Sequence, residues 1–306
     1  MGWPLRMFEP LKIYFVTVRC FQRRLFMRPS SETNTVLGGV LARSARMNGV
    51  EIFGFVFASN HVHLLVRAPR GNLPRFMQHL LTNISKKVGY VIRWKGRFWE
   101  RRYSAEPVLD EIAVLGRVRY MLAHGPKEGL VPKCAEWPGL SSLSMMLDGV
   151  PRRFRWFNWT LKSKTGSAKP STRFAEKWAE EETLALTPLP LQTLKSPEAL
   201  RRFLQDAMQA IESEAARCHR RFLGRAGVLR QNPLRKARKK ERTVRPPCHT
   251  SFPALLREYL EGYRAFVADF RWAASRWKLG DVTVKFPKGA YRPFIWPQAP
   301  SPQLAA

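Results

Sequence analysis

Acidic residues are scarce in this 306-residue chain, which has 23 Asp and Glu against 53 Lys and Arg and a formal net charge of +30. Such an excess of positive charge disfavours an ordinary metabolic enzyme and favours a polyanionic partner, either nucleic acid or an anionic membrane surface. Core-forming residues are not scarce, because hydrophobic residues make up 45% of the chain and aromatic residues 12%. The composition therefore predicts a folded protein and not a basic disordered tail.

Cysteine and long apolar runs are also lacking. The four cysteines are too scattered for a disulfide framework or a C-x-x-C zinc site. The longest apolar run near the start, residues 11–18, is interrupted by Lys12 and is too short for a signal peptide or a membrane span. We therefore expect a cytoplasmic, nucleoid-associated protein with no membrane partner, whose anionic partner is nucleic acid.

The chain divides into two regions of different sequence pattern, with a boundary near Gly149. Residues 1–150 alternate β-branched and aromatic residues and contain well-separated helical patterns. Residues 151–306 contain Pro-rich joints and one long basic run, and no repeat period is evident. The excess of basic residues extends over both regions, so charge alone does not separate them.

Seven elements are predicted in the first region, in the order β-α-β-β-α-β-α. They cover residues 13–19, 30–45, 51–58, 61–67, 73–91, 97–103 and 109–124. Strands and helices in this order are typical of a split βαβ arrangement. The sequence therefore predicts an α+β fold with a ferredoxin-like (RRM-like) antiparallel sheet and helices on one face.

The second region is predicted to be basic and mainly helical. Residues 172–186, 197–217 and 253–277 show helical patterns. Residues 217–245 are dense in Arg and Lys, which is as typical of a flexible, solvated segment as of an ordered segment that contacts DNA. A flexible basic segment also neutralises phosphates, so the two interpretations do not exclude each other.

The most informative string is Asn60-His61-Val62-His63-Leu64-Leu65-Val66. Successive side chains of a β-strand point to opposite faces, so His61 and His63 are expected on the same face. Neutral imidazoles are common ligands of divalent metals, and two of them leave positions open for water and phosphate oxygens. The H-x-H pattern alone favours the alternative of two surface or hydrogen-bonded histidines over a metal site.

Tyr120 and His124 follow in the last predicted helix of the first region, one turn apart and therefore on one face. Ala113 and Gly116 lie in the same row, where small side chains leave room for a substrate beside the phenol. Taken singly, Tyr120 is better explained as an amphipathic residue at a core edge than as a catalytic residue. His124, just before Gly125, is likewise better explained as an imidazole favoured by the helix C-terminus.

Together these motifs resemble the single-tyrosine HUH transposases (Y1 transposases of insertion-sequence type), in particular their REP-associated branch. The resemblance covers about residues 10–148. Beside the His-x-His string, it rests on the segments Gly96-Arg97-Phe98-Trp99-Glu100-Arg101-Arg102-Tyr103, Tyr120-Met121-Leu122-Ala123-His124-Gly125-Pro126-Lys127-Glu128-Gly129-Leu130-Val131 and Trp137-Pro138-Gly139-Leu140-Ser141-Ser142. The last two look like that family's Tyr-Ile-x-x-Asn-Pro-x-x-x-Gly-Leu-Val and Trp-Pro-x-Ser-Ser stretches.

The resemblance implies a metal-dependent transesterase that cleaves and rejoins single-stranded or hairpin DNA at hairpin-forming repeats. His61 and His63 would hold Mg²⁺ or Mn²⁺, and Tyr120 would be the nucleophile that forms a 5′-phosphotyrosine. The family's third ligand is an Asn or Gln four residues after the tyrosine, a position that His124 occupies in this chain. This departure keeps a metal-binding side chain but exchanges oxygen for nitrogen, which favours Mn²⁺ or a softer ion, or else marks a decayed copy.

Basic residues that flank these motifs are the expected DNA contacts: Arg67, Arg97, Arg101, Arg102, Arg117, Arg119 and Lys127. Glu100 is interpreted first as a surface charge and second as a carboxylate that orients a histidine. Tyr90 and Tyr103 are rival nucleophiles, less favoured because only Tyr120 has a ligand-capable partner one turn away. The dipeptides Cys218-His219 and Cys248-His249 are interpreted as coincidence, since flanking arginines oppose cation binding.

Two other functions remain open. A catalytically inactive DNA- or RNA-binding protein is one, since ferredoxin-like sheets with exposed aromatics also bind single strands. The other is a metal phosphoesterase in which His61, His63 and His124 activate water. The target sequence, the choice between a monomer and a homodimer, and the role of residues 151–306 are not determined by the sequence.

Overall fold

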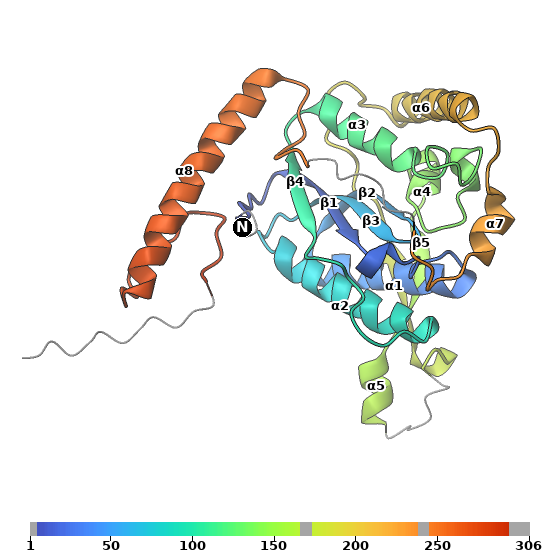
Figure 1. Ribbon diagram of the computed structural model, residues 1–306, viewed down its shortest axis with the longest axis horizontal. Helices are drawn as coiled ribbons and strands as arrows, with labels where there is room; N and C mark the ends of the chain where they lie inside the picture. The colour runs from blue at the N-terminus through green and yellow to red at the C-terminus, as the bar shows by residue number, and fades with distance from the viewer. Residues whose placement is uncertain (1–4, 166–172, 238–244, 294–306) are drawn as a thin grey trace, which may run out of the picture.

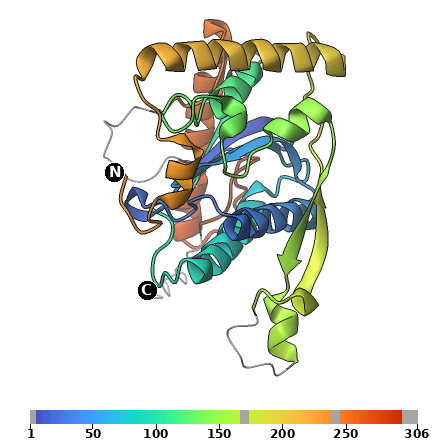
Figure 2. The ribbon, with the colours of Figure 1, turned by 90° about the vertical axis from the view of Figure 1, so that its right-hand side faces the viewer.

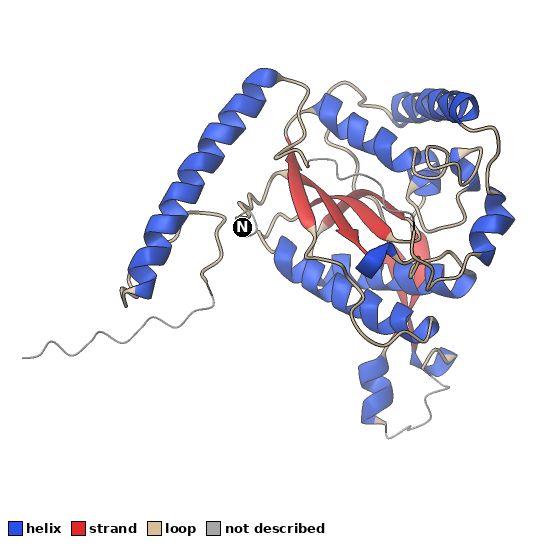
Figure 3. Cartoon of the chain, viewed as in Figure 1, coloured by secondary structure: helices blue, strands red, loops and turns tan. Residues whose placement is uncertain are grey.

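A four-stranded antiparallel sheet forms the centre of the computed structural model, which describes residues 5–165, 173–237 and 245–293 (Figures 1 and 3). Its strands are β1 (Ile13–Arg19), β2 (Glu51–Phe57), β3 (His61–Arg67) and β4 (Ser104–Val108). They lie in the order β2-β3-β1-β4, and each neighbouring pair is antiparallel. The α+β class and the ferredoxin-like sheet expected from the sequence are confirmed.

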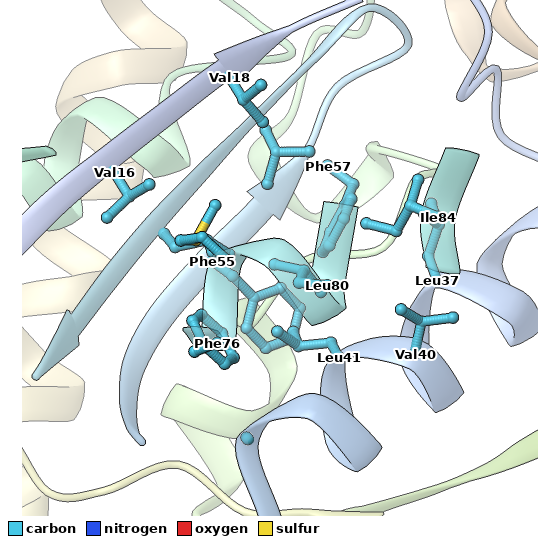
Figure 4. Packing of buried hydrophobic residues seen from close by; sticks show 14 of the residues in the cluster. Val16, Val18, Leu37, Val40, Leu41, Phe55, Phe57, Phe76, Leu80 and Ile84 are labelled. Carbon is cyan, nitrogen blue, oxygen red and sulfur yellow. The ribbon is translucent and has the colours of Figure 1, made fainter. Parts of the chain in front are cut away.

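Two long helices, α1 (Ser31–Asn48) and α2 (Leu73–Val91), cover one face of the sheet. The Ser30 side chain accepts a hydrogen bond from the backbone N–H of Thr33 and so caps α1, which ends at Gly49 in the left-handed conformation. The apolar faces of the two helices pack against alternate strand residues (Figure 4), and this core includes Val16, Val18, Leu37, Val40, Leu41, Phe55, Phe57, Phe76, Leu80 and Ile84.

The opposite face of the sheet is covered as well, which adds a second helical layer to the arrangement that the sequence predicted. Helix α3 (Glu111–Leu122) lies directly on this face, and α6 (Pro197–Cys218) packs outside α3, with α4 (Leu143–Asp148) beside them (Figure 1). The Asp110 carboxylate caps α3 by accepting from the N–H of Ala113. Phe15 and Leu65 of the sheet belong to this second core.

Residues 172–186 do not form the helix that their pattern predicts. A short 3-10 turn (Glu176–Trp178) leads into strand β6 (Ala179–Leu184), which pairs with a strand that the sequence did not indicate, β5 (Arg152–Phe157). Long-range ion pairs favour the strand, because buried Glu182 receives hydrogen bonds from two guanidinium groups on α1. Residue 172 itself lies outside the described residues.

The β5-β6 ribbon lies against α1 and projects beyond the sheet together with helix α5 (Trp159–Lys164) (Figure 2). Two consecutive glycines in the middle of α1 permit this contact. A Cβ on Gly38 would come within 2.1 Å of the Phe154 ring, and one on Gly39 within 2.0 Å of the Arg155 carbonyl oxygen. Glycine destabilises a helix interior by about 1 kcal/mol relative to alanine, and the close approach of β5 explains its presence here.

The strand predicted over residues 97–103 is wrong, since the fourth strand of the sheet, β4, begins at Ser104. Residues 97–103 form an irregular connection that contacts the end of β1 through an isolated bridge between Trp99 and Cys20 and a hydrogen bond from the Glu100 N–H to the Arg19 carbonyl. Tertiary packing outweighs local β-propensity here: the Phe98 ring packs on Phe26, and the Trp99 indole donates to the Leu81 carbonyl.

The remaining elements surround this centre. Short 3-10 turns cover Phe21–Arg23 and Cys134–Glu136, helix α7 spans Gly224–Arg230, and helix α8 spans Pro253–Lys278. The helices predicted over 197–217 and 253–277 are confirmed as α6 and α8. Residues 238–244 of the basic run lie outside the described residues, so its flexibility stays a prediction. No helix among the described residues is long and apolar enough to cross a membrane.

Candidate metal and nucleophile site

The candidate site lies between α3 and the sheet face that α3 covers. Strand alternation places His61 and His63 of β3 on this face, and the register sets His63 opposite Thr17 of β1. Phe15, two residues from Thr17, points the same way, and its ring stacks on that of His63 at 5.1 Å between centroids. The sequence-based expectation that the two histidines share a face is therefore confirmed.

His124 completes a cluster of three imidazoles. Helix α3 ends at Leu122, and His124 follows in a turn that directs its ring to the two strand histidines. His124 Nε2 and His61 Nε2 are 2.5 Å apart, and one ligand atom from each of the three residues falls within 4.8 Å of the others. His63 and His124 are buried and His61 is half-buried.

The surroundings of the cluster fit a bound cation. Asn60 Oδ1 lies 2.5 Å from His61 Nδ1 and accepts a hydrogen bond from its N–H, which leaves the Nε2 of neutral His61 with a lone pair. Two ring nitrogens only 2.5 Å apart repel each other unless a proton or a cation neutralises their lone pairs. His63 Nδ1 is held by the Thr17 hydroxyl at 2.9 Å, and its buried Nε2 has no hydrogen-bond partner within the described residues.

Electrostatics keep His63 neutral. Burial lowers the pKa of His63 well below its usual value, and the nearby His124, Arg19, Arg117 and Arg245 lower it further. A neutral imidazole is the form that ligates a metal. The three residues could therefore hold a divalent ion, although their geometry does not identify which ion.

Tyr120 is the one tyrosine of the three candidates whose ring faces these imidazoles. Its ring centroid lies 5.1 Å from that of His63 and 6.0 Å from that of His124. Tyr90 instead packs against Trp159 and Phe174. The hydroxyl of Tyr103 is buried in the core on the other face of the sheet, where burial raises its pKa to about 12.

Space is available next to the Tyr120 ring. Gly116, one turn before it on α3, has no other atom within 4 Å of the position that a Cβ would take. Ala113, a further turn away, is instead packed into the core between α3 and the sheet. The expectation that small residues leave room beside the phenol is therefore met at Gly116 and not at Ala113.

Positive groups surround the phenol. Two were predicted as DNA contacts: the Arg117 guanidinium carbon lies 5.2 Å and the Lys127 Nζ 5.8 Å from the centre of the Tyr120 ring. Arg19 of β1 and Arg245, which the sequence did not single out, interact electrostatically with each other and with His63. Buried Glu106, paired with Phe15 in the sheet, is a carboxylate close to Arg117 and Arg245, and burial raises its pKa.

The other predicted contacts lie elsewhere. Arg67 is at the opposite end of β3 from His61 and pairs with Glu51 at 2.5 Å. Arg97 donates to the backbone carbonyls of Trp99 and Glu100 in the connection before β4. Arg101, Arg102 and Arg119 are exposed. Glu100 is next to Arg19, whose carbonyl accepts its N–H at 2.9 Å, and its carboxylate also interacts with Arg19.

The structure also places His249 at the edge of the site, although the dipeptide Cys248-His249 was interpreted as coincidence in the sequence. His249 forms a parallel bridge with Val108, and its backbone N–H and C=O bond to Pro107 and Leu109 beside β4. Its ring lies edge-on to Phe15 at 5.6 Å, and burial together with Arg117 lowers its pKa to about 4. The second region of the chain therefore extends the sheet that carries the histidines.

Comparisons with known proteins identify the first region. Residues 9–120 match the family described as "Transposase IS200 like". A solved REP-associated tyrosine transposase bound to a REP hairpin aligns at 17% identity and a TM-score of 0.43, over 48% of this chain and 86% of that one. A protein from Deinococcus radiodurans R1, described as a candidate transposase, aligns at 20% identity and a TM-score of 0.29, over 39% of this chain and 92% of that one. No curated protein matches the chain.

The family match covers the four strands of the central sheet and helix α3 as far as Tyr120. It begins before β1, includes the His61-Val62-His63 strand and ends at Tyr120, so His124 and everything after it lie beyond the match. Residues 9–120 of this chain therefore match the model of the IS200-like transposases, in agreement with the resemblance noted in the sequence.

Proposed function

We propose that the protein is a metal-dependent transesterase that cleaves and rejoins single-stranded DNA at hairpin-forming repeats, with Tyr120 as the nucleophile. The observation that carries this proposal is the position of the Tyr120 ring, which faces two imidazoles of a three-histidine cluster. The transposase family of residues 9–120 supports DNA as the substrate.

The covalent step exchanges one phosphate ester for another. The Tyr120 oxygen forms a bond to the scissile phosphorus and gives up its proton to solvent, while the bond from phosphorus to the 3′-oxygen breaks and that oxygen takes up a proton. The products are a 5′-phosphotyrosyl strand and a free 3′-hydroxyl. Because the number of ester bonds does not change, attack by a 3′-hydroxyl reverses the step and rejoins DNA without an external energy source.

His61, His63 and His124 would hold the metal ion, consistent with the lone pair that Asn60 leaves on His61 and the unpartnered Nε2 of His63. A divalent ion bound there would withdraw charge from the phosphate oxygens and make the phosphorus easier to attack. Because the cluster is buried, the local dielectric constant is low, which would strengthen the attraction between the bound ion and the phosphate.

The cations around the phenol would hold the phosphate. Arg117 and Lys127 flank the Tyr120 ring, and Arg19 and Arg245 interact electrostatically with His63. A phosphodiester neutralises such a group of like charges, which otherwise repel one another. Glu106 is a buried carboxyl on this sheet face whose pKa burial raises, and it can offset only one of these four positive charges.

A covalent adduct tests the proposal. Full-length protein is incubated with hairpin-tipped single-stranded DNA from the repeats that flank its gene, together with Mn²⁺ or Mg²⁺. We expect a protein-DNA band on a denaturing gel, with the label mapped to Tyr120 by mass spectrometry. Tyr120→Phe should abolish the band, because removal of the hydroxyl removes the attacking oxygen.

Tyr90→Phe is the matched control, since it removes a hydroxyl from a tyrosine that packs against Trp159 and should form the adduct like the natural chain. Cleavage without an adduct that persists in Tyr120→Phe would contradict the proposal and indicate a phosphoesterase. DNA binding without cleavage in either metal would instead support an inactive binding protein.

A further inference from the structure

Helix α8, which lies beyond the part of the chain matched to the transposase family, is held against the body along one face. This face carries aromatic residues at helical spacing: Tyr259, Tyr263, Phe266, Phe270 and Trp277. The Tyr263 hydroxyl donates to the Leu5 carbonyl, and Phe270 packs on Phe286 of the segment that follows the helix. In Figure 1 the helix stands at the side of the molecule, next to the β4 edge of the sheet.

The segment after α8 fixes its orientation. The Phe8 N–H donates to the Gly289 carbonyl, and the Tyr291 hydroxyl donates to the Gly71 carbonyl. A Cβ on Gly289 would come within 2.5 Å of the Phe8 carbonyl oxygen, so this contact requires glycine. The helix and the segment that returns from it are therefore tied to the N-terminal strand region, and the outward face of α8 has a defined direction.

Four cations occupy that outward face in a straight row: Arg257, Arg264, Arg271 and Lys278. All four are exposed. Their spacing is seven residues, which is almost two full helical turns, so each side chain lies nearly above the last. At 1.5 Å per residue the row is about 31 Å long, with a cation about every 10 Å.

Charge is segregated around the helix. Helical periodicity places Glu258 and Asp269 on the opposite flank from the row, and Glu261 at its border, one turn from Arg257 and Arg264. The fifth basic residue, Arg276, also lies on the opposite flank and pairs with Asp281 at 3.2 Å. The four cations of the row therefore face solvent on the same flank. Among the acidic residues of the helix, Glu261 lies nearest to this row.

From this arrangement we infer that the basic row of α8 binds the backbone of duplex DNA, the stem of a hairpin substrate. This rests on the proposed DNA substrate but not on cleavage. A cationic row about 31 Å long matches about nine base pairs of B-DNA at roughly 3.4 Å each, and cations bind phosphates without regard to sequence. Single-strand sites instead use aromatic side chains that stack on bases, and the row contains none, since exposed Trp272 lies on the other flank.

The position of α8 connects this surface to the catalytic sheet. Only three residues separate His249, which bridges to β4, from Pro253, where the helix begins. The N–H of Ser251 donates to the Asp110 carboxylate that caps α3, so this connection is anchored to the helix of Tyr120. A stem held along α8 would thus enter the site from the β4 edge.

Salt-dependent binding tests the inference in the full-length protein without divalent metal, so that no cleavage occurs. The test variant replaces Arg257, Arg264, Arg271 and Lys278 with Gln. The control variant replaces four exposed cations of other helices with Gln: Arg75, Lys86, Arg202 and Arg217. The probes are a 12-base-pair hairpin and a single strand of the same length without self-complementarity, and circular dichroism checks that both variants remain folded.

We expect the test variant to bind the hairpin at least about tenfold more weakly than the control variant in 0.1 M salt, with a smaller loss for the single strand. Its slope of log affinity against log salt should fall by about 3 to 4, since each lost phosphate contact removes about 0.9. Equal hairpin affinities for the two variants would overturn the inference, as would an equal loss for both probes.

A gain of affinity provides a second test that does not depend on removing side chains. Glu261→Gln removes a negative charge at the border of the row and should strengthen hairpin binding severalfold, whereas Asp269→Asn makes the same charge change on the other flank and should do less. Equal effects would contradict the inference. If the natural chain binds neither probe, the proposed function fails as well; if it binds both and the row does not matter, only this inference fails.

Discussion

His124 is the residue at which this chain departs from the family it resembles, and the structure places it inside the imidazole cluster. Its Nε2 lies 2.5 Å from that of His61, although it follows the end of α3 in a turn. Gly125 permits the close approach of Val131 to this turn, because a Cβ would lie 2.6 Å from a methyl carbon of Val131. His124 thus directs a side chain that is capable of binding metal at the cluster.

At this scale the third imidazole is expected to determine metal affinity and preference. His124→Ala should weaken Mn²⁺ binding at least about tenfold, since loss of even an outer partner of a ligand has an effect of this size. His124→Asn should restore binding in part and shift the preference from Mn²⁺ toward Mg²⁺, because an amide oxygen is the harder donor. Calorimetric titration with each ion measures both effects.

His79→Ala is the control, since it removes an imidazole of α2 that bonds to Ser44 on the other side of the sheet. That variant should bind Mn²⁺ like the natural chain. Unchanged Mn²⁺ affinity in His124→Ala would show that the cluster is not a three-ligand site.

Among the elements, the β5-β6 ribbon is held to the first region by a buried lysine of α2. The Nζ of Lys87 donates to the Phe157 carbonyl and lies 4.3 Å and 4.4 Å from the ring centres of Trp156 and Trp159. Burial lowers the pKa of Lys87 to about 7. Part of the attachment of the ribbon therefore depends on a group that titrates near neutral pH.

This titration makes the stability of the natural chain depend on pH in a defined direction. Between pH 7 and about 10 the unfolded chain holds the Lys87 proton and the folded chain does not, so the free energy of unfolding rises with pH across this range. Below pH 7 both states hold the proton, and Lys87 makes no pH-dependent contribution. Lys87→Met should remove that dependence. Urea unfolding of both proteins at pH 6.5, 8 and 9 measures it, and a constant difference between them would contradict the prediction.

At the scale of the whole molecule, the two regions share their hydrophobic cores. Leu204 and Ile211 of α6 are buried in the core beneath α3, and Trp156 and Leu184 of the ribbon are buried in the core beneath α1. The Glu212 carboxylate also accepts from the N–H of Cys134. The second region therefore supports the shape of the site besides adding positive charge.

A chain that ends at residue 150 is consequently expected to be much less stable than the full chain. Leu204 and Ile211 alone bury surface worth about 1.5 to 3 kcal/mol each, and a whole domain is stable by only about 5 to 15 kcal/mol. Thermal unfolding followed by circular dichroism should show a lower Tm or no cooperative transition for the fragment. A fragment with the Tm of the full chain would show that the first region folds independently.

The sequence by itself determined the elements whose signals are local. Period-two alternation in β3 predicts that His61 and His63 share a face, and one helical turn predicts that His124 accompanies Tyr120. The structure brings these residues together, although α3 ends at Leu122 and His124 lies in the turn after it and not in the predicted helix. Helices α6 and α8 were predicted for the same reason, since an amphipathic period of 3.6 is a property of the segment itself.

Only the tertiary structure decided the features that depend on partners far away in the chain. β4 begins at Ser104 because the preceding aromatics pack on Phe26 and α2, and β6 is a strand because Glu182 meets arginines of α1. Strand pairing and the return of the second region to the sheet bring Arg19, Arg245 and His249 to the site. Neither of these leaves a periodic pattern in the sequence. Local periodicity indicates which face of a helix or strand a residue occupies. The residues that pack against that face come from distant parts of the chain, so they are determined only when the chain folds.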